Sequence, residues 1–190
     1  TNLTLTNTTG ASVPVYTMGT FRFELHGDPI PTSITDKTWM FAEGANIKVP
    51  AGSTVRICIC ERITVTSAPN QNYAFQASFN AGAYADLTTT CGNVCLASDP
   101  TIDDLEVAPD NLALGGSTYC CGSYTEAPGM SSPAFTVLTN QQVNRCVVVK
   151  VGAALVTNDT IDFKLVPASG DAVAGTAPRV TIGGGKNRAR

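Results

Sequence analysis

The stretch STVRICICERITVT at residues 53–66 decides the fold of this chain. Its apolar side chains alternate, and the residues of one parity are Val55, Ile57, Ile59, Ile63 and Val65, with Glu61 as the only interruption. The other parity carries Arg56, Cys58, Cys60, Arg62 and Thr64. β-Branched residues in strict alternation predict a strand with one buried face. We therefore expect a central strand in which Ile57 and Ile59 are buried and Arg56→Ala costs far less stability than a substitution of either isoleucine.

Shorter alternating runs repeat this design along the chain, at residues 21–25, 73–79, 134–139, 145–151, 161–165 and 179–182. No convincing amphipathic helix interrupts them. The pattern predicts an all-β, single-domain antiparallel β-sandwich, jelly-roll or immunoglobulin-like, of roughly eight to ten strands. We expect the sandwich to span residues 1–182, with a possible strand-exchange arm at 1–10, a Cys-rich irregular insertion at 88–133 and a basic C-terminal tail at 183–190.

The composition points to a surface that packs against other protein. Charged residues make up 14% of the 190 residues, against roughly 25% in an average soluble domain. A neutral, Thr-rich surface is typical of β-proteins that pack against copies of themselves or face the extracellular environment. The net charge of −3 argues against nucleic-acid binding by the chain as a whole. No run approaches the roughly 20 apolar residues of a membrane span.

Seven cysteines are the strongest chemical signal: Cys58, Cys60, Cys91, Cys95, Cys120, Cys121 and Cys146. Cys58 and Cys60 share one side of a strand with parallel side chains, so we expect no bond between them. Cys146 lies on another central-looking strand and is a candidate partner for one of them. The other four lie in the irregular insertion, where bridges would replace a missing core. We expect at least two disulfides; reduced buried thiols and a thiolate metal site are the alternatives, although the spacing lacks the CxxC pairs of zinc sites.

Few residues are candidates for catalysis. His26 is the only histidine, which removes multi-histidine metal sites and leaves one candidate base, and we expect it to be a turn residue. An acidic segment lacks the EF-hand order and is expected to be a solvated loop, with calcium left open: Asp99, Asp103, Asp104, Glu106 and Asp110. We expect no enzyme activity, no metal and no cofactor. Three glycosylation sequons begin at Asn2, Asn7 and Asn158.

The assembly contacts that we expect lie at the ends and in one long connection. Leu3 and Leu5 alternate in a segment that suits strand donation to a neighbouring sheet edge. Trp39 and Phe41 lie in the connection 27–45, either plugging the core or forming a contact patch. A basic tail ends the chain, and we favour a protein partner for it over nucleic acid: Lys186, Arg188 and Arg190.

Together these features favour a non-enzymatic structural subunit that assembles with copies of itself or with a major shell protein. A virion capsid or decoration (cement) protein is our first expectation, because the charge is low, a basic tail ends the chain and no basic and apolar leader opens it. The alternative is an exported subunit of an extracellular surface filament or pilus that uses N-terminal strand donation. The third is a carbohydrate-binding sandwich domain. The expected location is the virion or the extracellular space, without a membrane span.

Overall fold

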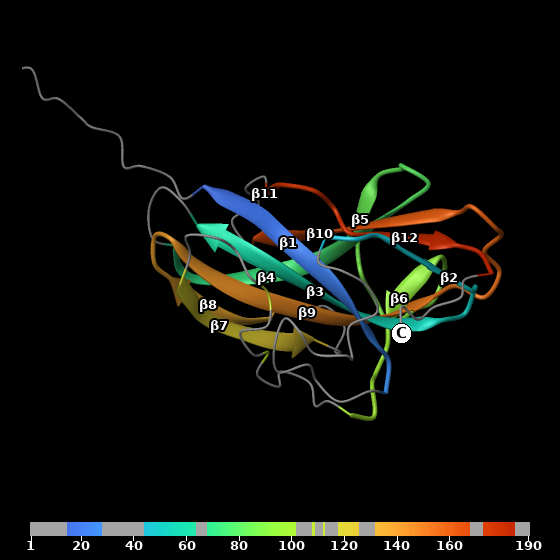
Figure 1. The fold of residues 1–190 in the computed structure, drawn as a ribbon, viewed down its shortest axis with the longest axis horizontal. Helices are drawn as coiled ribbons and strands as arrows, with labels where there is room; N and C mark the ends of the chain where they lie inside the picture. The colour runs from blue at the N-terminus through green and yellow to red at the C-terminus, as the bar shows by residue number, and fades with distance from the viewer. Residues whose placement is uncertain are drawn as a thin grey trace, which may run out of the picture.

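The computed structural model describes residues 15–27, 44–63, 68–101, 108, 112, 118–125, 132–167 and 173–184. These residues form twelve β-strands and no helix, arranged as two mostly antiparallel sheets of six strands each. Figure 1 shows the strands lying along the long axis of the molecule, with β3 and β9 at its centre. The predicted all-β sandwich is confirmed.

The first sheet, sheet A, is built around the strand that the sequence singled out. β3 pairs antiparallel with β1 on one side and with β9 on the other. β11 runs parallel to β1, while β6 and β7 share the far side of β9, with β7 parallel to it. The strands of sheet A are β1 (Tyr16–Leu25), β3 (Thr54–Ile63), β6 (Val94–Leu96), β7 (Thr118–Thr125), β9 (Gln141–Val151) and β11 (Val173–Ala174).

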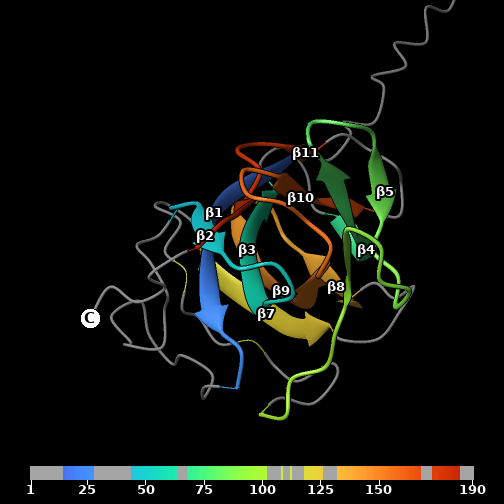
Figure 2. The same cartoon turned by 90° about the vertical axis from the view of Figure 1, so that its right-hand side faces the viewer.

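The second sheet, sheet B, packs face to face with sheet A (Figure 2). Its order is β2, β12, β10, β4, after which β5 and β8 share the last side of β4. The strands of sheet B are β2 (Ile47–Val49), β4 (Ala68–Phe79), β5 (Tyr84–Asp86), β8 (Ser132–Val137), β10 (Thr160–Pro167) and β12 (Arg179–Ile182). In each sheet, two strands therefore share one margin, β6 and β7 in sheet A and β5 and β8 in sheet B.

The main core lies between the sheets and follows the alternation of the sequence. Val55, Ile57 and Ile59 of β3 are buried there beside the valines of β9, and they meet Phe163 and Leu165 of β10. Because successive side chains of a strand point to opposite faces, these positions fix the register of the central strands.

A second buried layer covers the outer face of sheet A. It contains Cys58, Cys60, Leu112, Tyr124, Cys146 and Val148. Gly122 on β7 allows this close packing, because a Cβ atom there would lie 2.9 Å from the carbonyl oxygen of Ala108. The N–H of Ala108 donates a hydrogen bond to the carbonyl oxygen of Gly122. β3 is consequently buried on both faces, which its alternating pattern did not predict.

The segment 88–133 contributes two strands, β6 and β7, that the sequence analysis did not predict. Their sequences, VCL and TYCCGSYT, are short or rich in small and polar residues, so no alternating run marks them. β7 gains its order from β9, with which it pairs over most of its length. Apolar residues around Leu105 also predict one short strand in this segment, and that stretch lies outside the described residues.

We predict that Ile57→Ala lowers the free energy of unfolding by about 2–5 kcal/mol, because it leaves a cavity in the main core. Ile57 is fully buried on a strand that is paired along both edges. The matched control is Lys150→Ala on β9, whose side chain is exposed and whose loss we expect to change stability by less than about 0.5 kcal/mol. Urea denaturation followed by tryptophan or tyrosine fluorescence measures both, and equal small losses would show that β3 is not central.

Candidate functional site

The outer face of sheet A holds a cluster of buried charges. The Nε of Arg56 lies 3.3 Å from Oε2 of Glu24 on the neighbouring strand and 3.5 Å from Oδ2 of Asp99, and all three side chains are inaccessible to solvent. The hydroxyl of Tyr124 lies 3.1 Å and 3.2 Å from the two carboxylate oxygens of Glu24 and donates a hydrogen bond to this group. We name these four residues the outer charge cluster.

Asp99 connects this cluster to the turn after β1. Its Oδ2 accepts a hydrogen bond from the N–H of Gly27, and its Oδ1 accepts bonds from the N–H and the hydroxyl of Thr101. Burial opposes ionisation here, but the bonds from Thr101 and Gly27 and the charge of Arg56 lower the pKa of Asp99 below its ordinary value. Asp99 therefore anchors the turn after β1 to the outer charge cluster. The expectation that the acidic segment is a solvated loop is wrong for this residue.

Arg56 corrects a second expectation. The sequence placed it on the more exposed side of β3 and predicted a mild Arg56→Ala substitution, but the side chain is fully buried. Its removal would leave the carboxylates of Glu24 and Asp99 without their cation, and breaking a buried pair in this way typically costs about 3–5 kcal/mol. Cys58 and Cys60 lie on the same face of β3 and could have indicated from the sequence that this face is buried, since cysteine is among the residues most often buried.

A disulfide lies in the middle of this face. Cys58 on β3 and Cys146 on β9 are directly opposed in register and bonded to each other. A second disulfide joins Cys91 to Cys95 of β6. The predicted disulfides, including the partnership of Cys146 and the absence of a Cys58–Cys60 bond, are confirmed. Cys60, Cys120 and Cys121 are not in a disulfide.

One group of potential metal ligands occurs within the described residues, formed by Glu24, Cys58 and Cys146, whose ligand atoms all lie within 4.8 Å of one another. Neither sulfur is a thiolate while the disulfide is closed, and a thiolate is the form that binds metal. The Oε1 of Glu24 lies 2.9 Å from Sγ of Cys58, but a disulfide sulfur has no proton to donate. With Arg56 also beside Glu24, this group does not fit a metal ion.

A second set of buried polar residues lies inside the main core. The Nε of Arg145 on β9 lies 3.4 Å from Oε2 of Glu61 on β3, and its guanidinium lies 3.8 Å from the ring centroid of Tyr73 on β4. Burial raises the pKa of Glu61 to about 7, although the charge of Arg145 and hydrogen bonds from Tyr73 and Arg145 pull it down. The same burial raises the pKa of Tyr73, and it lowers that of Arg145. This inner charge cluster is closed to a substrate.

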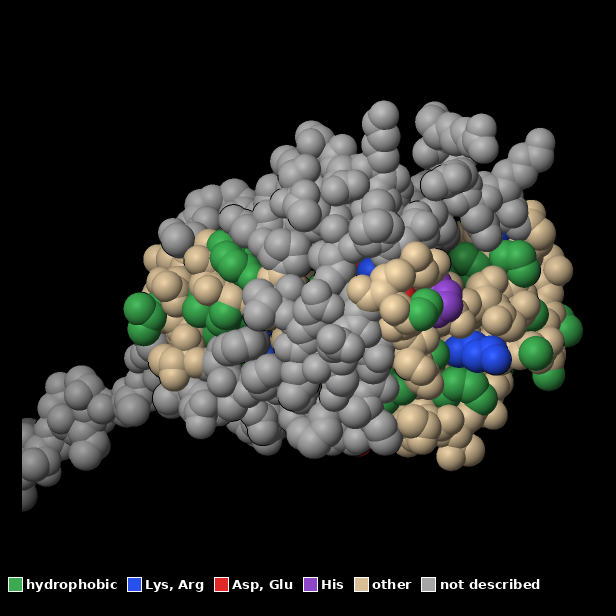
Figure 3. Space-filling view, turned by 90° about the horizontal axis from the view of Figure 1, so that it is seen from below, with side chains coloured by type: hydrophobic (Ala, Val, Ile, Leu, Met, Phe, Trp, Pro, Cys, Tyr) green, Lys and Arg blue, Asp and Glu red, His purple; other side chains and the backbone are tan. Residues whose placement is uncertain are grey.

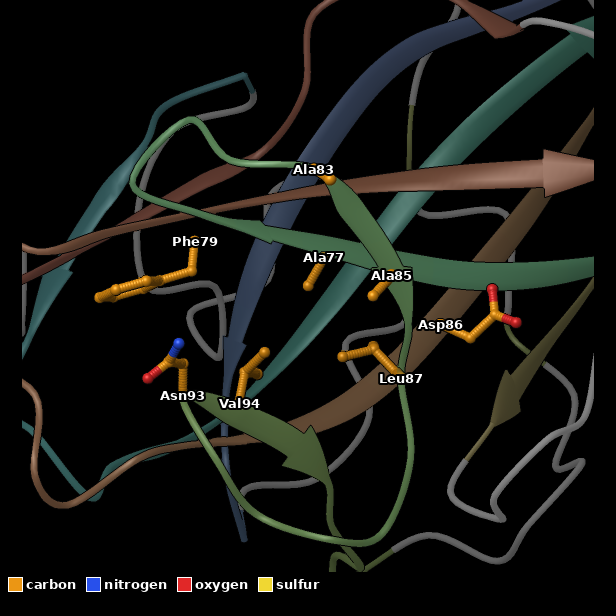
Figure 4. A pocket seen from close by; sticks show the side chains of 8 residues that line it. All are labelled: Ala77, Phe79, Ala83, Ala85, Asp86, Leu87, Asn93 and Val94. Carbon is orange, nitrogen blue, oxygen red and sulfur yellow. The ribbon is translucent and has the colours of Figure 1, made fainter.

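A hollow of about 250 Å³ opens between the two sheets at the margin formed by β5 and β6 (Figure 4). Asn80 and Ala81 build the tight turn before β5: both have positive φ, and the N–H of Gly82 donates to the carbonyl oxygen of Phe79. Six of its eight lining residues have apolar side chains and two have polar ones: Ala77, Phe79, Ala83, Ala85, Asp86, Leu87, Asn93 and Val94.

The polar groups of the hollow are few. The Oδ1 of Asp86 accepts a hydrogen bond from Nε2 of Gln76, and the side chain of Asn93 is exposed. No histidine, cysteine or second carboxylate lies among its lining residues. The hollow can therefore accept an apolar group, and its lining offers few side chains for acid–base or nucleophilic catalysis.

The remaining predicted site residues divide into two groups. His26 is exposed in the turn after β1, where its Nε2 lies 3.2 Å from the carbonyl oxygen of Ser98, which confirms a turn histidine. Asn158 is exposed with positive φ. The others lie outside the described residues: Asn2, Leu3, Leu5, Asn7, Trp39, Phe41, Asp103, Asp104, Glu106, Asp110, Lys186, Arg188 and Arg190.

The surface agrees with the low charge of the sequence. On the face drawn in Figure 3, few of the described side chains are charged. No helix of the described residues is long and apolar enough to span a bilayer.

The inner charge cluster generates a pH dependence that a variant can test. The pKa of Glu61 is raised in the folded state. Its contribution to the free energy of unfolding is therefore fully present below pH about 4.5 and is lost as the pH rises through about 7. This corresponds to a loss of about 3 kcal/mol across that interval. We predict that Glu61→Gln removes most of this slope in urea denaturation between pH 5 and 8. The control is Asp159→Asn, because its lowered pKa confines its effect to acid; an unchanged slope in Glu61→Gln would contradict the assignment.

Comparisons with known proteins do not assign this chain to a family. No family model matches the sequence, and no curated protein is similar to it at a significant level. Among solved structures, the chain is similar to a family 123 glycoside hydrolase from Clostridium perfringens, described in a study of glycolipid glycan hydrolysis. The TM-score is 0.35 at 7% identity over 73% of this chain, and the match covers 22% of the hydrolase chain. A likeness this weak carries no argument about function.

Proposed function

We propose that this chain is a non-enzymatic structural subunit that assembles with copies of itself by strand addition at β5, as a virion capsid or decoration protein. The observation that carries the proposal is the margin of sheet B next to the hollow. β5 has only three residues, and two of them, Ala85 and Asp86, are exposed. Among the described strands, only β4 pairs with β5.

An edge of this kind is a template for another strand. Its outward N–H and C=O groups can form a ladder with an extended segment, and adjacent pockets can take alternate side chains of that segment. Figure 2 places β5 at the outer margin of the sandwich, away from the central strands. A segment that joined this edge would extend sheet B and lie across the mouth of the hollow.

The size of the hollow favours a side chain as its occupant. At about 250 Å³ it is smaller than the roughly 300–1,000 Å³ of small-molecule sites. Six of its eight lining side chains, from alanine, leucine, valine and phenylalanine, are apolar and would contact a branched aliphatic group. Burying one leucine in such a place contributes roughly 1.5–3 kcal/mol.

The N-terminal sequence of a second copy supplies a segment with the required pattern. Leu3 and Leu5 are two residues apart, so in an extended strand they point to one face while Thr4 points to the other. The segment 2–6 is neutral, and it would meet an edge that carries a single charged side chain, Asp86. Residues 1–10 of a neighbouring subunit are therefore our proposed donor.

The disulfides support a location outside the cytosol. Cys58–Cys146 and Cys91–Cys95 are bridges of the kind that persist on virion and cell surfaces and are rare in the cytosol. An exported subunit of a surface filament is the second candidate, and the β5 edge favours it as well, because strand donation builds filaments when the contact does not close on itself. A carbohydrate-binding domain is the third, for which Phe79, Asp86 and Asn93 at the hollow would be the contacts.

We predict that a peptide with the sequence of residues 1–10 competes with assembly, because it occupies the edge of β5. The control peptide carries Leu3→Asn and Leu5→Asn. Within the full chain, Ala77→Leu fills the hollow and should weaken self-association by roughly 10–100-fold, the equivalent of one buried leucine. Ala153→Leu, at an exposed turn position, is the matched substitution that should leave it unchanged.

Sedimentation velocity over a range of concentrations measures these effects. We expect the oligomers to dissociate when the native peptide is added and to be weakened in the Ala77→Leu variant. The control peptide and Ala153→Leu should leave them intact. A chain that stays monomeric at every concentration, or oligomers indifferent to both the peptide and Ala77→Leu, would contradict the proposal. Binding of glycans that Asp86→Asn abolishes would favour the carbohydrate-binding candidate instead.

The basic tail provides a separate prediction. The N–H of Gly183 donates to the carbonyl oxygen of Val49, and Gly183 is buried, so a deletion that spares the fold begins after Gly184. We predict that removing residues 185–190 leaves the melting temperature nearly unchanged and weakens assembly, because it removes Lys186, Arg188 and Arg190 from contacts with a partner. The loss should be largest at low salt, where these charges act unscreened. Equal assembly of the full and truncated chains at every salt concentration would remove the tail from the proposal.

A further inference from the structure

Two adjacent cysteines on β7 have their sulfur atoms side by side. In a regular strand, neighbouring side chains point to opposite faces, which separates their ends widely. Here Sγ of Cys120 and Sγ of Cys121 lie 2.8 Å apart. That separation is only about 0.8 Å longer than a disulfide bond of roughly 2.04 Å.

A β-bulge explains this arrangement. The register of β7 against β9 runs from Tyr119 opposite Gln142 directly to Cys121 opposite Val143, so Cys120 is an extra residue without a partner position. A bulge places two residues of one strand against one of the other and bends the bulged strand. The bend removes the usual alternation at this point and brings the two thiols together.

We propose that Cys120 and Cys121 form a vicinal disulfide, and that this pair is a site of thiol–disulfide exchange with low-molecular-weight disulfides such as glutathione disulfide. The inference does not depend on the proposed assembly function. Together with Cys58–Cys146 and Cys91–Cys95, this bridge would place six of the seven cysteines in disulfides, and the seventh, Cys60, is buried and reduced.

The fold separates Cys60 from this pair. Cys60 is fully buried in the layer on the outer face of sheet A, whereas Cys121 packs against the main core on the opposite face. A bond between Cys60 and Cys121 would have to pass through the sheet. Cys120 remains the nearest reaction partner of Cys121 within the described part of the chain.

The exchange balances without any further reactant. The thiolate of Cys120 attacks one sulfur of glutathione disulfide, forms a mixed disulfide and releases one glutathione thiolate. The sulfur of Cys121 then gives up its proton and attacks Sγ of Cys120, which closes the ring and releases the second glutathione. The two cysteines lose two electrons and two protons, and the small disulfide gains them as two thiols.

The environment of Cys121 sets the order of these steps. Burial, together with the neighbouring Cys120, raises the pKa of the Cys121 thiol to about 12, so this sulfur is a poor nucleophile at neutral pH. Cys120 is accordingly the residue that meets the reagent, and Cys121 resolves the adduct. Since the second step requires deprotonation of Cys121, ring closure should accelerate as the pH rises from 7 to 9.

Counting alkylated thiols tests the proposal. The full chain, purified without reductant and incubated with glutathione disulfide, is denatured and treated with iodoacetamide before mass analysis. We expect one alkylated residue, Cys60, and a peptide covering 118–125 that is two hydrogens lighter than its reduced form. A Cys60→Ser variant should show no alkylation, and Cys120→Ser should show it at both Cys60 and Cys121.

Three outcomes would overturn the inference. The first is three alkylated thiols at Cys60, Cys120 and Cys121 after exposure to the disulfide. The second is a glutathione adduct that persists on Cys120 at pH 9, since an adjacent resolving thiol would have displaced it. The third is a bridge from either residue to Cys60 or to another chain.

Discussion

The pairing of β3 with β9 is the constraint on which the rest of the structure depends. The two strands lie side by side at the centre of sheet A, and the Cys58–Cys146 disulfide joins them at directly opposed positions. This bridge spans 88 residues of sequence, and the chain-entropy model assigns roughly 4–5 kcal/mol to a loop of that length. Cys91–Cys95 spans only 4 residues and constrains far less.

The β3–β9 pair also carries buried charges on both of its faces. Arg56 is held on the outer face with Glu24 and Asp99, while Arg145 is held in the core with Glu61. Desolvation largely offsets the attraction within such pairs, so their net contribution to stability is small, but a misaligned strand would leave an unpaired buried charge. We infer that the charge clusters add to the register set by the apolar alternation of β1, β3 and β9, and that burial of Val55, Ile57 and Ile59 supplies most of the free energy of folding of these strands.

The sequence predicted the fold class and the central strands because alternation is a local signal. Ile57 and Ile59 were placed correctly, as was Cys146 opposite β3. The burial of Arg56 and the strand at residues 118–125 were not predicted, since both depend on segments that fold across the sheet from elsewhere in the chain. The hollow beside β5 was also inaccessible to sequence analysis, because it forms where β4, β5 and β6 meet in space.

Native-state hydrogen exchange tests most directly the claim that β3 and β9 form the centre of the molecule. Every strand residue of β3 has a partner on β1 or β9, and both faces of the strand are covered. We expect the backbone amides of β3 and β9 to exchange most slowly, through global unfolding, and more slowly than those of β4 and β10 in sheet B. Faster exchange in β3 and β9 than in sheet B would contradict it.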